Sequence, residues 1–410
     1  MSDDLASGAS MSGMAQHTWA RRCRQRAAIG LAMLALIALA GCASAPPAPM
    51  SSAALFDDAA FAPASEPIDA RSVFALSPEM QRYLEDRIKP RAFRVGSRAA
   101  LIEALYERGE LKLTYDTEQT RTAAQAFDAR SGNCLSLVIM TAAFAKQMHL
   151  QVQYQSVLVD DTWSRSGGLM FANGHVNLVL GLRPLDTQFG SHDADLLVVD
   201  FLPTEEARRA RARSISEDTV LAMFMNNRAA EALAQGRLDD AYWWARTAIA
   251  QTPTFMAAYN TLGVIYRRHG NAAQALRVLD YAHAVEPANT LVMSNLIQVL
   301  GDLGQTARAQ DLAATLARIE PEPPFHYFDL GLAAMRAGDF FTAREYFAKE
   351  VARAAYYHEF HFWLALADYR LGHLSQARQH LSVAMENSTT RAEHDLYAAK
   401  LDWLRAHTVQ

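Results

Sequence analysis

The C-terminal half of the chain repeats its pattern of apolar, small and turn-forming residues every 34 positions. A glycine recurs five times at this interval, at Gly236, Gly270, Gly304, Gly338 and Gly372. An alanine follows each glycine by five positions, which lets two helices approach closely, while the glycine closes the turn between them. Prolines at Pro253, Pro287 and Pro321 keep the same register and end the second helix of a pair. The spacing predicts five helix pairs over residues 215–391.

Residues 392–410 carry helical apolar spacing without a further glycine turn. We expect one amphipathic helix there, covering the last apolar face, because terminal repeats need a polar outer surface. Stacked helix pairs normally form binding surfaces and carry no chemistry of their own. The period of 34 residues, with these glycine, alanine and proline positions, resembles the tetratricopeptide repeat, and this resemblance implies an all-α solenoid of five such repeats. The repeats therefore predict a protein or peptide partner on their surface. The aromatic residues Tyr242, Trp243 and Trp244 are expected either to pack between helices or to grip such a peptide.

Residues 68–214 change from helical spacing to strand-like runs along the chain. Helical spacing covers residues 78–88, 97–110, 122–127 and 134–149. Strand patterns follow at residues 151–159, 175–182 and 195–201, with a glycine-containing hairpin at 167–168. The basic run at Arg208, Arg209, Arg211 and Arg213 is expected on the solvated face of a connecting helix. Helices followed by antiparallel strands predict an α+β layered domain before the all-α repeats.

Cys134 lies in the sequence Ser131-Gly132-Asn133-Cys134-Leu135-Ser136, at the predicted start of the fourth helix. The dipole and free amides of a helix N-terminus favour the reactive thiolate form of a cysteine. His175 lies in a predicted strand, and Asp200 follows the apolar run of another. A cysteine, a histidine and a carboxylate are the parts of a nucleophile, its base and the orienting group of that base.

The first 41 residues have the features of an export signal. Four arginines precede an apolar run at residues 27–40, which is too short for an ordinary membrane-spanning helix. The run ends in Leu39-Ala40-Gly41-Cys42, which resembles the bacterial lipoprotein box, in which the cysteine receives the lipid. We therefore expect a signal peptide at 1–41 and a lipid-anchored, periplasm-facing protein. Ala43, in place of an aspartate after Cys42, resembles the signal for the outer membrane.

Processing of this kind leaves Cys134 as the remaining free thiol. The chain has three cysteines, of which Cys23 leaves with the signal peptide and Cys42 is lipidated. Residues 42–67 are rich in alanine, proline and serine, and we expect them to form a flexible tether. A buried cysteine that acts as a small apolar side chain is the structural alternative for Cys134.

Composition and motifs exclude several classes of function. The 410 residues are 50% hydrophobic and carry a net charge of −5, which gives no reason to expect nucleic-acid binding. The sequence contains no glycine-rich phosphate loop and no dinucleotide fingerprint, so we expect no cofactor. His358 and His361 stand three positions apart, but no third residue completes a metal-ligand spacing.

Three short motifs together resemble the transglutaminase-like branch of the papain-like cysteine enzymes. Arg130 to Ser136 resembles the turn that opens the catalytic helix of that family, and Gly174-His175-Val176-Asn177 resembles its histidine strand. Residues 198–204 resemble the segment in which an aspartate ends a strand shortly before a proline. The resemblance covers about one third of the chain. It implies that Cys134 attacks an amide carbonyl, that His175 carries the proton, and that Asp200 holds the imidazole by its other nitrogen.

Rival histidines and carboxylates are less suitable. His149 lies 15 positions beyond Cys134 on the predicted helix, which places it roughly 20 Å away at about 1.5 Å per residue. His192 lies in a polar loop, and a solvated role is expected for it. Asp193 and Asp195 are loop charges, whereas Asp186 follows the end of a strand and is a weaker rival to Asp200.

The donors that stabilise an oxyanion are less clear from the sequence. The main-chain amide of Cys134 is the default donor at a helix N-terminus. Papain-like enzymes add a glutamine six positions upstream, where this chain has Asp128. Tyr154 and Gln155 are candidates for a side-chain donor. The missing glutamine leaves two functions open: a cysteine hydrolase or acyl transferase, and a scaffold with an inactive domain and peptide-binding repeats.

Overall fold

The computed structural model describes residues 54–106, 113–115, 119–166, 169–181, 196–201, 211–388 and 390–407. The predicted signal peptide, the lipidation site Cys42 and the first part of the tether lie outside these ranges. So do the predicted hairpin at 167–168 and the rivals Asp186, His192, Asp193 and Asp195. Within the described ranges, no helix combines the length and the apolar character that crossing a bilayer requires.

Short helices build the first part of the fold. They are η3 (Asp58–Ala60), α2 (Ala70–Val73), α3 (Pro78–Tyr83), the π-helical η4 (Leu84–Ile88), α4 (Lys89–Val95), α5 (Ser97–Tyr106), α6 (Ala123–Ala129) and α7 (Cys134–Gln147). Their starts follow from local sequence. Ser77 caps α3, whose first residue is Pro78, and Thr122 forms a capping box with Gln125 at α6. The helical spacing of residues 78–88 therefore produces helix, with a π-helical second half.

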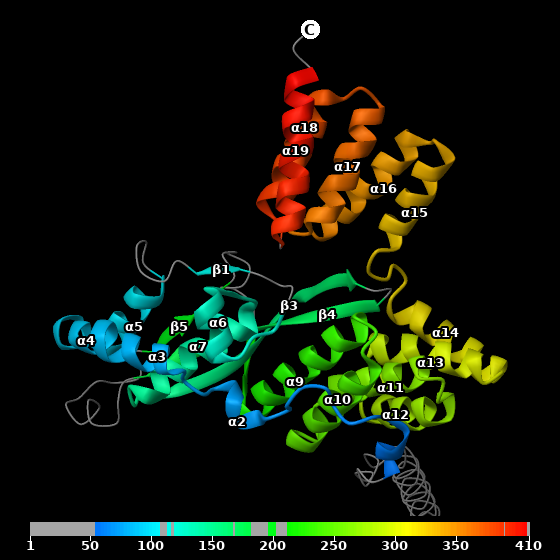
Figure 1. Cartoon of the computed structure of the whole chain (residues 1–410). Coiled ribbons are helices and arrows are strands. Elements are labelled where there is room, and N and C mark those ends of the chain that lie inside the picture. The colour runs from blue at the N-terminus through cyan, green and yellow to red at the C-terminus, as the bar shows by residue number, and fades with distance from the viewer. Residues whose placement is uncertain are drawn as a thin grey trace, which may run out of the picture. The chain divides into compact units, whose positions relative to one another are not determined.

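A small sheet follows these helices. Its four strands, in the order β5-β4-β3-β6, are all antiparallel: β5 (Leu197–Val199), β4 (Leu169–Leu180), β3 (Val152–Ser166) and β6 (Arg211–Ile215). A separate two-residue parallel pair joins β1 (Thr114–Tyr115) to β2 (Ser131–Gly132). Helix α7 packs on the sheet through β4 and β3 (Figure 1).

The basic run after residue 210 is a strand, which corrects the expected connecting helix. Arg211 and Arg213 alternate with Ala212 and Ser214 in β6, which pairs with β3 at the edge of the sheet. Charged side chains are well suited to an exposed edge strand, because they oppose pairing with a further chain. Only Ile215, opposite the buried Tyr154, turns toward the core.

Five helix pairs lie within the described residues 211–388. They are α9 (Glu217–Ala234) with α10 (Leu238–Gln251), α11 (Met256–Arg268) with α12 (Ala272–Val285), α13 (Thr290–Asp302) with α14 (Thr306–Ile319), α15 (His326–Ala337) with α16 (Phe340–Arg353), and α17 (His358–Arg370) with α18 (Leu374–Glu386). The glycine between the helices of each pair has a positive φ of 69° to 88°, a conformation that glycine adopts without strain. Helix α19 (Arg391–His407) follows as the expected terminal helix.

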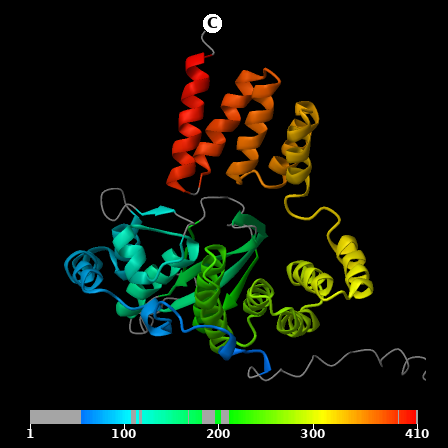
Figure 2. The same cartoon turned by 45° about the vertical axis from the view of Figure 1, so that its right-hand side comes forward.

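The helix pairs do not share one continuous core. A first core runs from Leu55 through the short helices and the sheet to Leu300 in α13. Helix α14 has no buried residue, and separate cores begin at Phe325 and Ala365. In both views α9 to α14, green to yellow, form one group of helices, and α15 to α19, orange to red, form another (Figures 1 and 2). The sequence predicts two domains with their own cores, but the first core includes both the sheet and the first three pairs.

Prolines explain the interruption between the third and fourth pairs. Pro321, Pro323 and Pro324 lie between α14 and α15 and cannot extend either helix, and Phe325 then adopts a left-handed φ of 65°. The β3 strand contacts the start of the fourth pair instead. Arg165 forms two hydrogen bonds with the Asp329 carboxylate, at 2.7 and 2.8 Å, and stacks on the Phe325 ring.

Residues 54–66 lie along the first two helix pairs and are called the strap below. Leu55 is fully buried and Phe61 is 6% exposed, with its ring stacked on Tyr242 at 4.0 Å between centroids. The main-chain amide of Asp57 donates to the hydroxyls of Tyr242 and Tyr266, both at 3.0 Å. The strap, blue in Figure 1, therefore corrects the second half of the predicted flexible tether, whose apolar residues are anchored in the core.

Candidate active site

Cys134 is the first residue of α7, as the sequence predicts. Asn133 caps the helix, since its side-chain oxygen accepts from the Ser136 amide at 2.9 Å and from the Ser136 hydroxyl at 2.8 Å. Gly132 lies so close that a β-carbon added there would be 2.7 Å from Cβ of Ser136. Most of α7 is buried, whereas Cys134 at its tip is half-buried. The turn therefore presents the thiol at the edge of a tightly packed helix.

His175 and Asp200 meet on adjacent strands. His175 lies in β4, 2% exposed, and its Nε2 is 2.7 Å from Oδ1 of Asp200. Val199 pairs with Leu178, so continuing the antiparallel register places Asp200 opposite Asn177 and diagonal to His175. The Cys134 side chain lies close enough to the imidazole to contribute to its raised pKa. The structure therefore brings all three predicted residues together.

The surroundings of His175 favour its charged form. Burial is the largest influence and by itself lowers the pKa of the imidazole. The interactions of the imidazole with Asp200, whose carboxylate accepts its hydrogen bond, and with Cys134 oppose burial, and together they raise the pKa of His175 to about 9. The imidazole is therefore protonated at neutral pH. A protonated imidazole between a thiol and a carboxylate is suited to stabilising a thiolate and to delivering a proton.

Asn177 belongs to the same group, although sequence reasoning assigned it no role. Its side-chain nitrogen donates to Oδ2 of Asp200 at 3.0 Å, while His175 occupies the other oxygen. Asn177 is buried and follows His175 by two positions, so both side chains lie on the same face of β4. That spacing of two within a strand is the signal that could have identified it. Asn177 and His175 together fix the orientation of the carboxylate.

Of the two candidate oxyanion donors, Tyr154 is already engaged elsewhere. Its hydroxyl donates to Oε2 of Glu217 at 2.8 Å, and burial, with Glu217 adding to it, raises the pKa of Tyr154 far above its usual range. Tyr154 pairs with Leu178 and Ile215, whereas Gln155 pairs directly with Asn177. Opposite residues of an antiparallel pair share a face, so Gln155 lies on the face of His175 and Asn177. The geometry favours Gln155 as the side-chain candidate.

The remaining described rivals lie away from this group. His149 follows α7 at its far end, is exposed and has a left-handed φ of 58°. The helix ends before it, at Gln147, since the Met148 amide closes the last turn. Asp128, which stands where papain-like enzymes have glutamine, is exposed near the end of α6.

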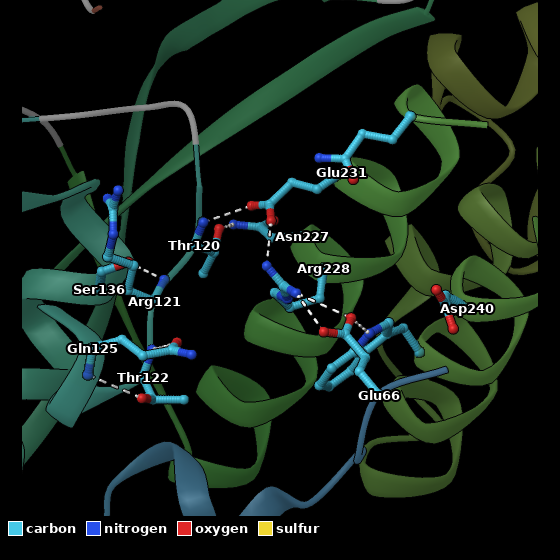
Figure 3. Close-up of polar contacts among 12 residues, drawn as sticks. Glu66, Thr120, Arg121, Thr122, Gln125, Ser136, Asn227, Arg228, Glu231 and Asp240 are labelled. Atoms are coloured by element: carbon cyan, nitrogen blue, oxygen red, sulfur yellow. Dashed lines mark hydrogen bonds and ion pairs between the residues drawn. The ribbon is translucent and has the colours of Figure 1, made fainter. Parts of the chain in front are cut away.

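Polar groups around Thr120 link the segment before α6 to the first helix pair (Figure 3). The Thr120 amide donates to Oε1 of Glu231 on α9 at 2.6 Å. The Thr120 hydroxyl accepts from the side chain of Asn133 at 2.9 Å and from that of Asn227 at 3.3 Å. Arg228, also on α9, bridges Glu231 to Glu66 at the end of the strap. A repeat helix is thus linked, through Thr120, to the residue that precedes the thiol.

The histidines of the fifth pair form other contacts. Nδ1 of His358 lies 2.9 Å from the Tyr397 hydroxyl, and Nδ1 of His361 lies 3.1 Å from Nδ1 of His380. Burial lowers the pKa values of all three histidines, which favours their neutral forms. Among the described residues, no group of three or more histidine, cysteine or carboxylate side chains is arranged to hold a metal ion.

No protein-family model and no curated protein sequence matches the chain. Solved structures with similarity include the APC/C hetero-tetramer Cut9–Hcn1, at a TM-score of 0.29 and 16% identity, over 46% of this chain and 37% of that chain. Another is a thermophilic TPR protein of Thermus thermophilus, with a TM-score of 0.29 and 19% sequence identity, over 44% of this chain and 98% of that chain. YrrB, a TPR protein with an unusual peptide-binding site, has a TM-score of 0.24 and 18% sequence identity, over 44% of this chain and 92% of that chain. The chain spans about a third of the first of these, and likeness of this extent carries no information on activity, substrate or partner.

Proposed function

We propose that this protein is a cysteine hydrolase or acyl transferase of the transglutaminase-like type, which acts on an amide bond of a peptide or protein. The observation that carries the proposal is the arrangement of His175, with Nε2 at 2.7 Å from Asp200 and the Cys134 side chain close enough to the same imidazole to raise its pKa. A buried histidine is more often structural, but here it joins a half-buried thiol at a helix tip to a carboxylate held by Asn177.

The reaction proceeds through a thioester. The Cys134 thiolate attacks the carbonyl carbon, and the electron pair of the C=O bond moves to oxygen. When the tetrahedral intermediate collapses, the C–N bond breaks and protonated His175 gives its proton to the leaving amine. Water, in hydrolysis, or a second amine, in transfer, then attacks the thioester. His175 takes the proton of this nucleophile, and the thiolate leaves.

Asp200 keeps the imidazole in position throughout this cycle. Its hydrogen bond to Nε2 directs Nδ1 toward the thiol and stabilises the imidazolium. The oxyanion is stabilised by the main-chain amide of Cys134 at the start of α7, and Gln155 is the proposed side-chain donor. Both donors are uncharged, so the charge of the intermediate is balanced by the imidazolium.

In this proposal the repeats recruit the partner that carries the substrate, and the lipidated N-terminus anchors the protein to the membrane. Five helix pairs offer a surface for a protein or peptide partner that carries the substrate. The strap covers part of the first two pairs, which leaves the later pairs as the more open surface for a partner. Cys42 carries the lipid that anchors the chain to the periplasmic side of the outer membrane.

The test measures thiol reactivity and amide turnover in the mature chain. Cys134 alkylation by iodoacetamide is followed by mass spectrometry from pH 5 to 10, and a peptide library is screened for amide cleavage. Cys134→Ser and His175→Ala are expected to abolish turnover, and His175→Ala to remove the enhanced alkylation near neutral pH. His149→Ala, an exposed histidine at the far end of the same helix, is the matched control.

Product masses distinguish the two reactions, because transfer to an added amine retains that amine whereas hydrolysis adds water. Full turnover by the Cys134→Ser variant contradicts the mechanism. Cys134 alkylation that matches a free cysteine peptide at every pH supports the alternative function, a scaffold with an inactive domain.

A further inference from the structure

Helix α9 begins the first helix pair, yet two of its polar side chains contact Thr120, which in turn contacts the Cys134 turn. Glu231 and Asn227 project from α9 toward Thr120, on the segment that leads into α6 (Figure 3). Thr120 is 1% exposed, and Ser136 on the other side of the turn is fully buried. Polar groups buried to this degree are costly unless each is hydrogen-bonded, so their arrangement is strongly constrained.

Hydrogen bonds through Thr120 link Glu231 to Asn133, the residue that precedes the nucleophile. Glu231 accepts from the Thr120 amide at 2.6 Å, a charge-assisted bond, and the Thr120 hydroxyl accepts from Asn133 at 2.9 Å. Asn133 caps α7 with its other side-chain atom and precedes Cys134 directly. Each atom of the Asn133 amide is therefore held, one by the catalytic helix and one by a residue that α9 fixes.

We propose that Glu231 of the first repeat is a positioning residue for Cys134, acting through Thr120 and Asn133. The proposal rests on the proposed nucleophilic role of Cys134. Glu231 touches neither the thiol nor the imidazole, so its effect is on geometry: it fixes the main chain at Thr120, which in turn fixes the cap of the helix that begins with the thiol. The first repeat is then part of the active site as well as part of a binding surface.

The Glu231 carboxylate forms an ion pair with Arg228. Burial raises the pKa of Glu231, while the hydrogen bonds from Thr120 and Arg228 act against that rise. Arg228 donates to Oε2 of Glu231 at 3.0 Å and to both oxygens of Glu66 in the strap, at 3.0 and 3.1 Å. Arg228 therefore contacts both the end of the strap, at Glu66, and the proposed positioning residue, Glu231. Changing Glu66 is expected to affect Cys134 in the same direction as changing Glu231, but less.

The experiment compares carboxamide variants of the full-length mature chain by the rate and pH profile of Cys134 alkylation with iodoacetamide. Glu231→Gln is expected to slow alkylation near neutral pH by about 10- to 100-fold, since small displacements at a reacting centre have effects of that size. Glu66→Gln is expected to lie between this variant and the wild type. Glu350→Gln is the matched control, because Glu350 on α16 is a buried carboxylate that likewise accepts a main-chain amide, that of Tyr327, at 2.8 Å.

Thermal unfolding separates positioning from stability. Glu231→Gln and Glu350→Gln are both expected to unfold at lower temperature, but only Glu231→Gln is expected to change Cys134 alkylation by more than twofold. If the two variants alkylate alike, the positioning role is overturned. A different result contradicts the proposed function, namely a His175→Ala variant whose Cys134 is alkylated at the wild-type rate.

A second variant keeps the proposal testable if Glu231→Gln does not fold. Thr120→Val conserves the volume and the main-chain bond to Glu231 but removes the hydroxyl that accepts from Asn133. It is expected to slow alkylation to a similar extent, and the double variant to be no slower than either single variant, because both act along one path. Normal alkylation in a folded Thr120→Val variant contradicts the proposal.

Discussion

At the residue scale, the pKa of His175 is raised by its interactions with two partner side chains. Burial disfavours the imidazolium, and it is the contacts with Asp200 and Cys134 that reverse this effect. Asn177 contributes indirectly, by holding the second oxygen of the carboxylate. The chemistry of the site therefore depends on the geometry among these side chains more than on any one residue type.

Asp200→Asn is expected to lower the pKa of His175 from about 9 toward its ordinary value of 6.5, because the charged partner of Nε2 is lost. A folded-state pKa above the unfolded one stabilises the protein fully below pH 6.5, and this contribution disappears as the pH rises through about 9. The variant should therefore lose most stability, relative to the wild type, in acid. Urea unfolding at pH 6 and pH 10 checks the sign, and an equal loss at both contradicts it. Turnover is expected to fall by about two to four orders of magnitude.

Tyr154 and Gln155 are expected to differ in their effects on rate. Tyr154→Phe removes a hydroxyl that donates to Glu217, so it should reduce stability by about 1 kcal/mol and leave turnover unchanged. Gln155→Ala should lower kcat by about 10²-fold, as expected for the loss of an oxyanion donor. Steady-state kinetics and urea unfolding of both variants test this. The reverse pattern would assign the oxyanion role to Tyr154.

At the element scale, the start of α7 depends on close packing of its first turn. Gly132, Asn133 and Ser136 form a compact turn in which the cap of the helix and the approach of the chain share the same atoms. The sequence predicts the glycine turn and the helix start, because both are local signals. It does not predict that Asn133 also binds Thr120, since that contact depends on how two segments pack.

Gly132→Ala is expected to displace Ser136 and the thiol, because the new β-carbon would lie 2.7 Å from Cβ of Ser136. Overpacking of this kind should cost about 1–3 kcal/mol, with a loss of turnover beyond the loss of folded protein. Gly174→Ala is the matched control, because no atom outside its neighbours lies within 4 Å of a β-carbon at Gly174. Chemical unfolding and Cys134 alkylation measured on both variants provide the test. Equal behaviour of the two would show that the turn tolerates a side chain.

At the scale of the whole molecule, the first core joins parts of the chain that are distant in sequence. Leu55 and Phe61 of the strap, the short helices, the sheet and the first three helix pairs all contribute to it. The first helix pairs are therefore structural neighbours of the thiol, and the later pairs, with separate cores, are more independent.

Phe61→Ala is expected to lower the free energy of unfolding by about 3 kcal/mol, since the ring is buried and stacks on Tyr242. The strap should then be cleaved faster by a protease, because Leu55 is the fully buried apolar side chain that remains in it, beside the partly buried Phe56 and Ala60 and the polar contacts. Phe93→Ala is the matched control, since that ring is 92% exposed. Urea unfolding and limited proteolysis measure both effects. A strap that stays protected in Phe61→Ala would show that its polar contacts suffice.

The sequence by itself determined the helix pairs, the glycine turns, the helix that begins at Cys134 and the order of cysteine, histidine and aspartate. These features depend on periodicity, capping and turn chemistry, which act over a few residues and are therefore written into neighbouring positions. The tertiary structure decided that Asn177 holds Asp200, that Arg211 and Arg213 form an edge strand, that the strap packs on the repeats, and that Glu231 reaches the turn of Cys134. Each of these features depends on a contact between segments that are distant in sequence. Burial and strand register in the assembled fold decide whether such a contact forms, so no pattern among neighbouring residues reveals it.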